Sequence, residues 1–279
     1  MGQCLGLVEY IGRPDRAGHP IVTKLHALII ALVCLLAHGV ADAGERLRIG
    51  IGKDYPPFYY ADIHGKMRGF EVDLAEAICA EIDAKCMFVP TERWDHLIPG
   101  LLAGRYDVLM ASVSITDPRK RHLLFSRKYY SSRASMLAMK DIPIDPRRPE
   151  TMSGRIVGVE SGTTHESFAQ QHFAPMNVKV APYVTLSEAL LDLQRGEVDA
   201  VIGDKIALLG ALQNQDRGRC CQLIGDDLDD PAILGQSVGA AFRQKDLALK
   251  RRFDDAIERI IVSGEYMRIN DRHFPFDVY

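Results

Sequence analysis

The chain has 279 residues, of which 47% are hydrophobic and 25% are charged, and its formal net charge at pH 7 is −3. This length accommodates one large or two medium domains, and the composition is that of an ordinary globular protein. The small negative charge gives no reason to expect nucleic acid or an anionic membrane surface as a partner.

The first 43 residues have the layout of a secretory signal peptide with an unusually long N-terminal region. Lys24 precedes the apolar stretch 25–36, and Ala41 and Ala43 place small residues at the two key positions of a cleavage site. A membrane anchor is the alternative, but a membrane-spanning helix needs roughly 20 apolar residues. The sequence therefore predicts export, with cleavage near Ala43.

Four cysteines follow that segment: Cys79, Cys86, Cys220 and Cys221. Disulfides are expected in an exported protein, and Cys79 and Cys86 lie close enough along the chain to be joined. Neighbouring Cα atoms lie about 3.8 Å apart, which is shorter than an ordinary disulfide favours. For Cys220 and Cys221, a vicinal bond, two free thiols and an intermolecular link all stay open. No cluster of Cys or His at ligand spacing accompanies them, so we expect no metal site.

Strands and helices alternate in the first part of the mature chain. Strand patterns at 46–52, 87–89 and 106–110 enclose two segments with apolar residues at helical spacing, 74–82 and 94–104. This β-α-β-α-β order predicts a parallel sheet with right-handed crossovers.

Three aromatic residues in this part are candidates for packing or for binding. The prolines after Tyr55 fix an extended path, along which we expect Phe58 to pack in the core. Tyr55 lies at the C-terminal end of a strand, so it either forms a wall of a binding site or packs. Trp94 is the only tryptophan, and at a strand-to-helix junction it either stacks on a ligand or is buried.

The strand at 106–110 leads into a polar turn that carries Ser112 and Ser114, and a helix begins after Thr116. Thr116 is a suitable N-cap, and a proline two residues later suits the first helical turn. Ligands of open α/β sheets bind beyond the carboxyl ends of the strands. Arg119 offers a planar bidentate guanidinium there, and a helix N-terminus favours negative charge. This turn therefore predicts a site for a small carboxylate.

A second α/β series follows the proline-containing loop 143–149. We expect its strands and helices at 135–140, 155–159, 178–181 and 198–202 (strands), and from 163 and at 186–195 (helices). A last strand at 237–242 and helices at 247–263 and 266–270 are expected to return to the first lobe. The chain would then cross between two lobes twice, at a hinge.

Two loops of the second series carry polar residues at strand ends. In the first, Glu160 precedes a Ser-Gly-Thr-Thr sequence at a helix N-terminus, which suits an anion. Thr163 and Glu166 also have the spacing of a capping box, which is compatible with anion binding. In the second loop, Asp204 is either an N-cap or a carboxylate that faces the space between the lobes, and the pattern alone favours the cap.

Several motifs occur in a fixed order: YPPF at 55–58, GFEVDLAEAIC at 69–79, LIPGLLAGRYDV at 97–108, SVSITDPR at 112–119, GTTHE at 162–166, DLQRGEVDAVIGD at 192–204 and a final HFPFDVY. With these motifs and the Cys79/Cys86 spacing, the chain resembles the periplasmic solute-binding proteins of polar amino-acid ABC importers. Within them it is similar to the lysine/arginine/ornithine-, histidine- and arginine-binding group. The resemblance covers essentially all of the mature chain.

The resemblance implies an α/β fold of the two-lobed, type II periplasmic-binding-protein class. Each lobe would be a mainly parallel sheet flanked by helices, with a hinged cleft between them. We expect lobe 1 at 44–132 and 237–279, and lobe 2 at 133–236. The resemblance also implies a Cys79–Cys86 disulfide, no cofactor, and a periplasmic monomer that delivers an amino acid to an inner-membrane ABC permease.

The resemblance further implies how the ligand head group is held. Arg119 would pair with the α-carboxylate, assisted by Thr164. Asp204 and Ser114 would hold the α-ammonium, and Ser112 would add a hydrogen bond. This fits a zwitterion, which needs one cationic and one anionic partner that lose water together.

The same resemblance implies that Tyr55 and Trp94 sandwich the ligand side chain. Lysine/arginine/ornithine and histidine binders usually carry an acid three residues before the loop tyrosine, where this chain has Gly52. Arginine-binding relatives place a Glu at the position of Glu160, so we predict a basic ligand, with arginine first and lysine, ornithine or histidine next. Asp54 is the alternative source of negative charge. If neither acid reaches the ligand, an opine or a polar neutral amino acid is expected.

An enzyme is the rival function. Exported cyclohexadienyl dehydratases share this fold and much of its sequence pattern, and they act on a cyclic carboxylate. The chain has no nucleophile-elbow or metal motif. An ammonium partner at Asp204 favours amino-acid capture, although arogenate is itself an amino acid. We therefore predict a binding protein with no catalytic residues.

Overall fold

The structure is a computed structural model, and it describes residues 45–213 and 215–279. The predicted signal peptide at 1–43 lies outside the described residues. The described part belongs to one structural unit, Gly44–Tyr279. None of the helices described in it is long and apolar enough to cross a lipid bilayer.

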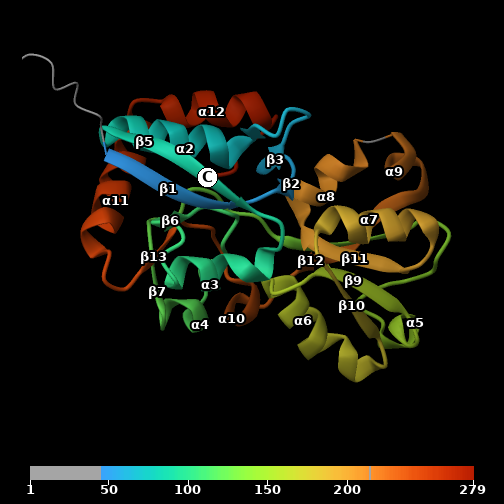
Figure 1. The fold of residues 1–279 in the computed structure, drawn as a ribbon. Coiled ribbons are helices and arrows are strands. Elements are labelled where there is room, and N and C mark those ends of the chain that lie inside the picture. The colour runs from blue at the N-terminus through green and yellow to red at the C-terminus, as the bar shows by residue number, and fades with distance from the viewer. Residues whose placement is uncertain (1–44, 214) are drawn as a thin grey trace, which may run out of the picture. The chain divides into compact units, whose positions relative to one another are not determined.

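The first of two five-stranded sheets has the strand order β5-β1-β6-β13-β7 (Figure 1). Its strands are β1 (Glu45–Gly52), β5 (Ala84–Thr91), β6 (Val108–Leu109), β7 (Leu123–Phe125) and β13 (Ala241–Arg243). β1 is parallel to β5 and β6, as the sequence predicts, whereas β13 is antiparallel to both β6 and β7. β13 enters this sheet from the far end of the chain.

The second sheet has the order β10-β9-β11-β8-β12 and repeats the same pattern. Its strands are β8 (Ala134–Met139), β9 (Ile156–Glu160), β10 (Lys179–Tyr183), β11 (Ala200–Asp204) and β12 (Cys221–Leu228). β9 is parallel to β10 and β11, and β8 is antiparallel to β11 and β12. The predicted parallel βαβ units therefore make up three strands of each sheet. An antiparallel strand lies beside them, β13 in the first sheet and β8 in the second. Each is the first strand after the chain crosses into that sheet.

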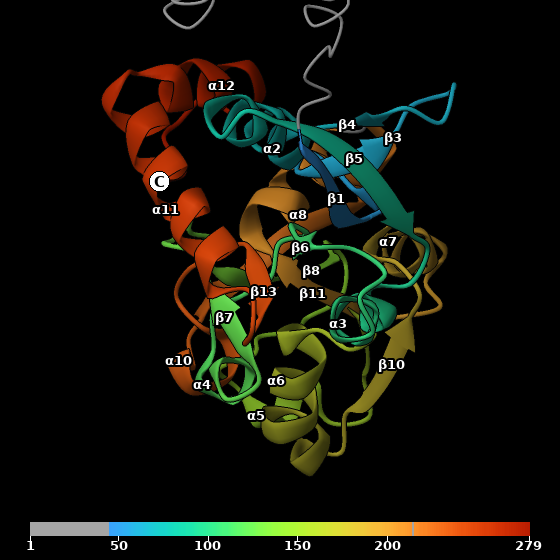
Figure 2. The same cartoon turned by 60° about the vertical axis from the view of Figure 1, so that its left-hand side comes forward.

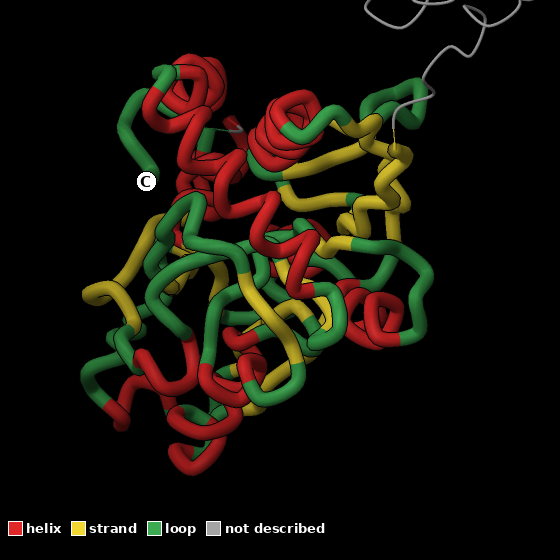
Figure 3. Tube along the Cα trace, turned by 90° about the vertical axis from the view of Figure 1, so that its left-hand side faces the viewer, coloured by secondary structure: helices red, strands yellow, loops and turns green. Residues whose placement is uncertain are grey.

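Helices pack on both sheets. The first sheet packs against α2 (Phe70–Glu81), α3 (Leu97–Leu102) and α11 (Leu247–Val262), and the second against α6 (Thr164–His172), α7 (Leu186–Arg195) and α8 (Lys205–Leu212). α12 (Glu265–His273) packs on α2 and α11. Short helices are η2 (Trp94–His96), α4 (Asp117–Lys120), α5 (Pro149–Met152), η3 (Ala174–Met176), α9 (Gln215–Cys220) and α10 (Pro231–Leu234). Figure 2 shows α11 and α12 beside α2, and Figure 3 shows the helices in red and the strands in yellow.

The return of the C-terminal segment to the first sheet has a clear sequence cause. α11 buries Phe253, Ala256, Ile257 and Ile260, which recur at the spacing of one helical face. This is the amphipathic helix that the sequence predicts at 247–263, and its buried face packs against α2 and the strands of the first sheet.

The two crossings between the sheets lie side by side. The N–H of Val238 donates to the carbonyl of Tyr130 at 3.0 Å, and the N–H of Tyr129 donates to the carbonyl of Val238 at 3.0 Å. The predicted lobe boundaries at 132/133 and 236/237 fall in these crossings, and the exact boundaries stay a prediction.

A small three-stranded sheet follows β1, where the sequence analysis expected only an extended loop. It consists of β2 (Asp54–Tyr55), β3 (Tyr59–Ala61) and β4 (Met67–Arg68). The turn contains a cis Pro56–Pro57 bond and closes with the N–H of Phe58 donating to the carbonyl of Tyr55 at 3.0 Å. Phe58 is completely buried, which confirms the prediction that it packs in the core.

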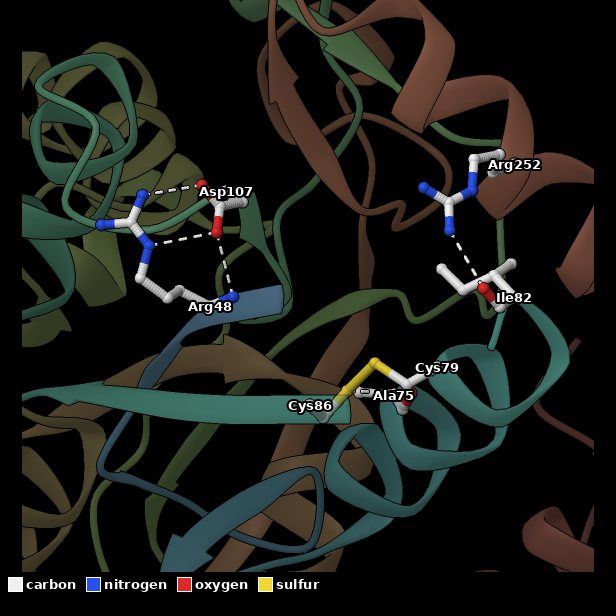
Figure 4. Close-up of a disulfide and its surroundings, with 7 residues drawn as sticks. All are labelled: Arg48, Ala75, Cys79, Ile82, Cys86, Asp107 and Arg252. Atoms are coloured by element: carbon white, nitrogen blue, oxygen red, sulfur yellow. Dashed lines mark hydrogen bonds and ion pairs between the residues drawn. A yellow bond between two sulfur atoms is a disulfide. The ribbon is translucent and has the colours of Figure 1, made fainter. Parts of the chain in front are cut away.

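A disulfide joins Cys79 on α2 to Cys86 on β5, as expected (Figure 4). The same end of α2 is tied to α11, because the guanidinium of Arg252 donates to the carbonyl of Ile82 at 3.0 Å. Cys220 and Cys221 are also bonded to each other, so of the three open alternatives the structure contains the vicinal disulfide.

We expect the double substitution Cys79→Ser/Cys86→Ser to lower the free energy of unfolding by about 2 kcal/mol, because the bond closes a short loop in the unfolded chain. The matched control is Cys220→Ser/Cys221→Ser, which opens the smallest possible loop and should cost about 1 kcal/mol. Urea unfolding of the non-reduced mature proteins measures both values. No loss in the first variant would mean that the Cys79–Cys86 bond does not form.

Candidate ligand-binding site

One pocket collects loops from the ends of strands of both sheets. All eight residues predicted to bind ligand line it: Tyr55, Trp94, Ser112, Ser114, Arg119, Glu160, Thr164 and Asp204. Tyr59, His165 and Thr163 also line it, and of these the sequence predicted only Thr163, as a helix cap. The pocket therefore brings together residues from both halves of the mature chain.

The cation of the pocket is Arg119, which the loop after β6 positions. The hydroxyl of Thr116 accepts the N–H of Arg119 at 3.4 Å, which confirms the predicted N-cap of α4. The guanidinium donates to the carbonyl of Ser114 at 3.0 Å and lies 4.9 Å from the centre of the Trp94 ring, a cation–π contact. Burial lowers the pKa of Arg119 to about 10. No carboxylate of the described residues lies within ion-pair distance of it.

Asp204 ends β11 and occupies the N-cap position of α8, but its carboxylate caps nothing. Instead it accepts a hydrogen bond from the hydroxyl of Tyr55 at 2.9 Å. The residue pattern alone favoured a capping role for Asp204, and that interpretation is wrong. Its carboxylate bonds to Tyr55, which follows a strand of the first sheet, and not to the N–H groups of α8. His165 lies 3.9 Å from the carboxylate, and burial lowers its pKa, so a neutral imidazole does not balance the charge.

Glu160 is the last residue of β9, and it is only 6% exposed. Among the residues that the structure describes, no lysine, arginine or histidine lies within 4.0 Å of its carboxylate. Burial raises the pKa of Glu160 well above its usual range, and the nearby carboxylates of Asp54 and Asp204 raise it further. A buried carboxyl without a cationic partner is costly, and a cationic ligand would relieve that cost.

Gly52, where the resemblance would place an acid, has no room for a side chain. A Cβ atom at Gly52 would lie 2.4 Å from the Tyr59 ring, so the ring occupies the space that a side chain would need. Asp54, the alternative acid, lines the cavities outside this pocket. Of the two candidates for the missing carboxylate, Glu160 is therefore the one that faces the pocket.

The loop at 160–166 owes its shape to a helix cap. The hydroxyl of Thr163 accepts the N–H of Glu166 at 3.3 Å, and the carboxylate of Glu166 accepts the N–H of Gly162 at 2.7 Å. This confirms the predicted pairing of Thr163 with Glu166, although the return bond reaches one residue further back than in a standard capping box. The cap fixes the start of α6, where the hydroxyl of Thr164 lies at the pocket.

Residues from the two sides approach each other closely. The hydroxyls of Ser114 and Thr164 lie 3.5 Å apart, and Tyr55 contacts Asp204 directly. The cavity left between the side chains is about 10 Å³, which is room for about one water molecule. A larger cavity of about 340 Å³ lies beyond Ser114, His165 and Asp204, against the two crossing segments. An amino acid can enter the pocket only if these side chains move apart.

The family model for bacterial extracellular solute-binding proteins, family 3, matches residues 47–276. The chain belongs to this family. An L-arginine-binding protein of Pseudomonas aeruginosa is 35% identical over 256 residues, which cover 92% of this chain and 98% of that protein. Both the resemblance and the two-lobed α/β fold class inferred from the motifs are thereby confirmed.

Two solved structures are similar to this chain in fold and sequence. An ancestral arginine-binding protein bound to arginine has a TM-score of 0.75 and 30% sequence identity, covering 83% of this chain and 99% of that one. An ancestral amino-acid-binding protein, a precursor of cyclohexadienyl dehydratase, has a TM-score of 0.72 and 26% sequence identity. The match covers 88% of this chain and 99% of that one. The second shows that the rival function lies close to this fold.

The pocket residues that the sequence analysis missed had weak signals. Tyr59 follows a residue that packs in the core, and only the absence of a side chain at Gly52 indicates that a ring lies opposite. His165 directly follows Thr164 in the first turn of α6, so its position beside a selected residue was the available signal.

We expect Tyr55→Phe to lower the free energy of unfolding by about 1–3 kcal/mol, because it removes the hydrogen bond from the buried carboxylate of Asp204. Tyr60→Phe is the matched control, since that exposed ring lies in the same small sheet and should change stability by less than about 0.5 kcal/mol. Urea unfolding of both variants without ligand checks the difference. Equal effects would show that the Tyr55 hydroxyl does not stabilise Asp204.

Proposed function

We propose that this protein is the periplasmic substrate-binding component of an ABC importer and that it captures a basic L-amino acid, with arginine first. One observation carries the proposal: the pocket holds a cation and two carboxylates, and the protein itself pairs neither Arg119 nor Glu160 with an opposite charge among its described residues. A ligand with one carboxylate and two cationic groups complements this set. Lysine, ornithine and histidine are the next candidates.

The head group would be held by residues from both sides of the pocket. Arg119 pairs with the α-carboxylate, and the hydroxyl of Thr164 assists it. Asp204 accepts the α-ammonium, with Ser114 beside it and Ser112 adding a hydrogen bond. The 3.5 Å distance between the hydroxyls of Ser114 and Thr164 supports this division, because both reach the same small space.

The ligand side chain would extend toward Glu160, between Tyr55 and Trp94. The bonds already made by the pocket support a simple exchange: the ligand ammonium takes the place of the Tyr55 hydroxyl on Asp204. Tyr55 is then free to pack its ring on the side chain of the ligand. A cationic end group at Glu160 would satisfy the buried carboxylate.

Capture would work through movement of the lobes, which we place at 44–132 with 237–279 and at 133–236. The two crossings lie side by side, which supports a hinge at these segments. Both lobes contact the zwitterion only when they are closed, so the ligand shifts the equilibrium toward the closed form. The closed protein, a monomer in the periplasm after removal of residues 1–43, would then deliver its cargo to an inner-membrane permease.

Dehydration of a cyclic carboxylate is the second candidate function. It is supported by Glu160 itself, because a buried carboxyl with a raised pKa can hold the proton that a departing hydroxide needs. Arg119 would still bind the substrate carboxylate. We favour capture without turnover because a basic amino acid satisfies every charge in the pocket, whereas prephenate brings two anions and no cation.

Calorimetric titration of the refolded mature protein is the deciding experiment. We expect arginine to bind most tightly among arginine, lysine, ornithine, histidine and glutamine, and we expect no turnover. Arogenate and prephenate are then added with detection of phenylalanine and phenylpyruvate. No heat with any amino acid, together with the appearance of either product, would overturn the proposal in favour of the dehydratase.

We expect Glu160→Gln to weaken arginine binding about tenfold to a hundredfold, since a hydrogen bond to a charged group contributes about 1.5–3 kcal/mol. Glutamine binding should be unchanged, whereas Arg119→Ala should abolish binding of every amino acid. Because a bound cation stabilises ionised Glu160, whose pKa burial raises, arginine binding should release protons and strengthen with rising pH until that pKa is passed.

Titrations in buffers of different ionisation enthalpy measure the proton release, which Glu160→Gln should remove. Equal losses for arginine and glutamine in this variant would contradict the assignment of Glu160 to the ligand's cationic end.

A further inference from the structure

A third buried carboxylate contacts a pocket residue without lining the pocket itself. Glu71, in the first turn of α2, is completely buried. Its carboxylate accepts the N–H of Ser112 at 2.9 and 3.0 Å and the hydroxyl of Ser112 at 3.0 Å. The hydroxyl of Tyr129 donates to the same carboxylate. One side chain thus receives both donors of a pocket residue and a third donor from a distant segment.

The backbone of Ser112 needs such a partner. Its φ is +53°, in the left-handed region that residues other than glycine rarely adopt. A residue held there costs free energy and persists only when its surroundings fix it. The carboxylate of Glu71 accepts from both the N–H and the side chain of Ser112, and these bonds fix this conformation.

The other donor connects Glu71 to the crossings between the sheets. The N–H of Tyr129 donates to the carbonyl of Val238 at 3.0 Å, and its carbonyl accepts the hydroxyl of Tyr266 at 2.6 Å. The next residue, Tyr130, pairs with Val238. Glu71 therefore touches the pocket loop on one side and the start of a crossing segment on the other.

We propose that Glu71 is a positioning residue that holds the Ser112 loop in its binding conformation and ties it to the crossing at Tyr129. The proposal rests on the function proposed above, because the loop it holds is the one assigned to the ligand head group. Loss of Glu71 then weakens every amino-acid ligand by the same factor, unlike loss of Glu160.

Burial raises the pKa of Glu71 to about 7, while the bonds from Tyr129 and Ser112 oppose that shift. The charged and titratable groups around it are Asp204 and the tyrosines 59, 129 and 130. The ionised and the protonated carboxyl both offer an oxygen to the N–H of Ser112. The tie therefore holds on both sides of neutral pH.

The chain contains its own probe of the loop. Trp94 is the only tryptophan in the sequence, and its indole N–H donates to the carbonyl of Ala111 at 3.0 Å, directly before Ser112. Movement of the loop breaks or lengthens this bond. It also exposes a side chain that is now 7% exposed, so the fluorescence emission shifts to longer wavelength.

The test compares Glu71→Leu, which offers no acceptor, with Glu71→Gln, which keeps one carbonyl oxygen. Asp73→Asn is the control: Asp73 lies on the same helix but pairs with Arg272 at 3.1 Å and His273 at 2.8 Å, away from Ser112. We expect Glu71→Leu to shift the emission of the ligand-free protein and to weaken arginine and ornithine equally, by at least tenfold. Glu71→Gln should fall between it and the parent protein in both measurements.

The control should lower the unfolding midpoint without changing emission or affinity. Unchanged emission and affinity in Glu71→Leu, or the same changes in Asp73→Asn, would overturn the proposal. If Glu71→Leu does not fold, Tyr129→Phe decides: a shifted emission and weaker binding of both ligands support the tie, and no change overturns it. If the parent protein binds no amino acid, the proposed function fails, while the ligand-free emission still decides whether Glu71 holds the loop.

Discussion

The pocket depends on two buried ionisable groups, Arg119 and Glu160, that do not pair with each other. An ionised group loses hydration on burial, and the loss is recovered only if an opposite charge or several hydrogen-bond donors replace the water. The guanidinium of Arg119 contacts a backbone carbonyl and the face of the Trp94 ring. The carboxylate of Glu160 has no cationic partner among the described residues. The two are not within ion-pair distance of each other: Arg119 lies after β6 of the first sheet, and Glu160 ends β9 of the second. Both groups are therefore free to pair with a ligand, which a direct ion pair between them would prevent.

Rigid local elements hold these charges in place. Arg119 follows the N-cap at Thr116, and the loop that begins at Glu160 ends at the N-cap Thr163, so in each case a helix start fixes the polar groups beside it. Each loop also follows a strand of a five-stranded sheet. On the function proposed above, the two lobes would move on binding, each as a whole, while each half of the pocket keeps its shape. Preorganisation of this kind reduces the entropy lost when a ligand binds.

The sequence predicted what local chemistry determines and missed what distant contacts determine. The caps at Thr116 and Thr163 are set by residues three positions apart, and both were predicted. The role of Asp204 as an acceptor depends on Tyr55, 149 residues away, and the support of Ser112 depends on Glu71, 41 residues away. The antiparallel position of β13 likewise depends on where the chain returns, which strand periodicity does not encode. The family resemblance assigned Asp204 to the pocket where the residue pattern alone did not.

Glu160 shows how one buried carboxyl suits two functions. A carboxyl with a raised pKa binds either a proton or a ligand cation, because each removes the cost of its buried charge. On the function proposed above, a ligand guanidinium would expel the proton and leave nothing to donate, so the protein would release the ligand unchanged. A ligand that brings no cation leaves the proton in place, and the same group can then act as an acid. On that proposal, the charge that the ligand places against Glu160 would separate a receptor from a dehydratase on this scaffold.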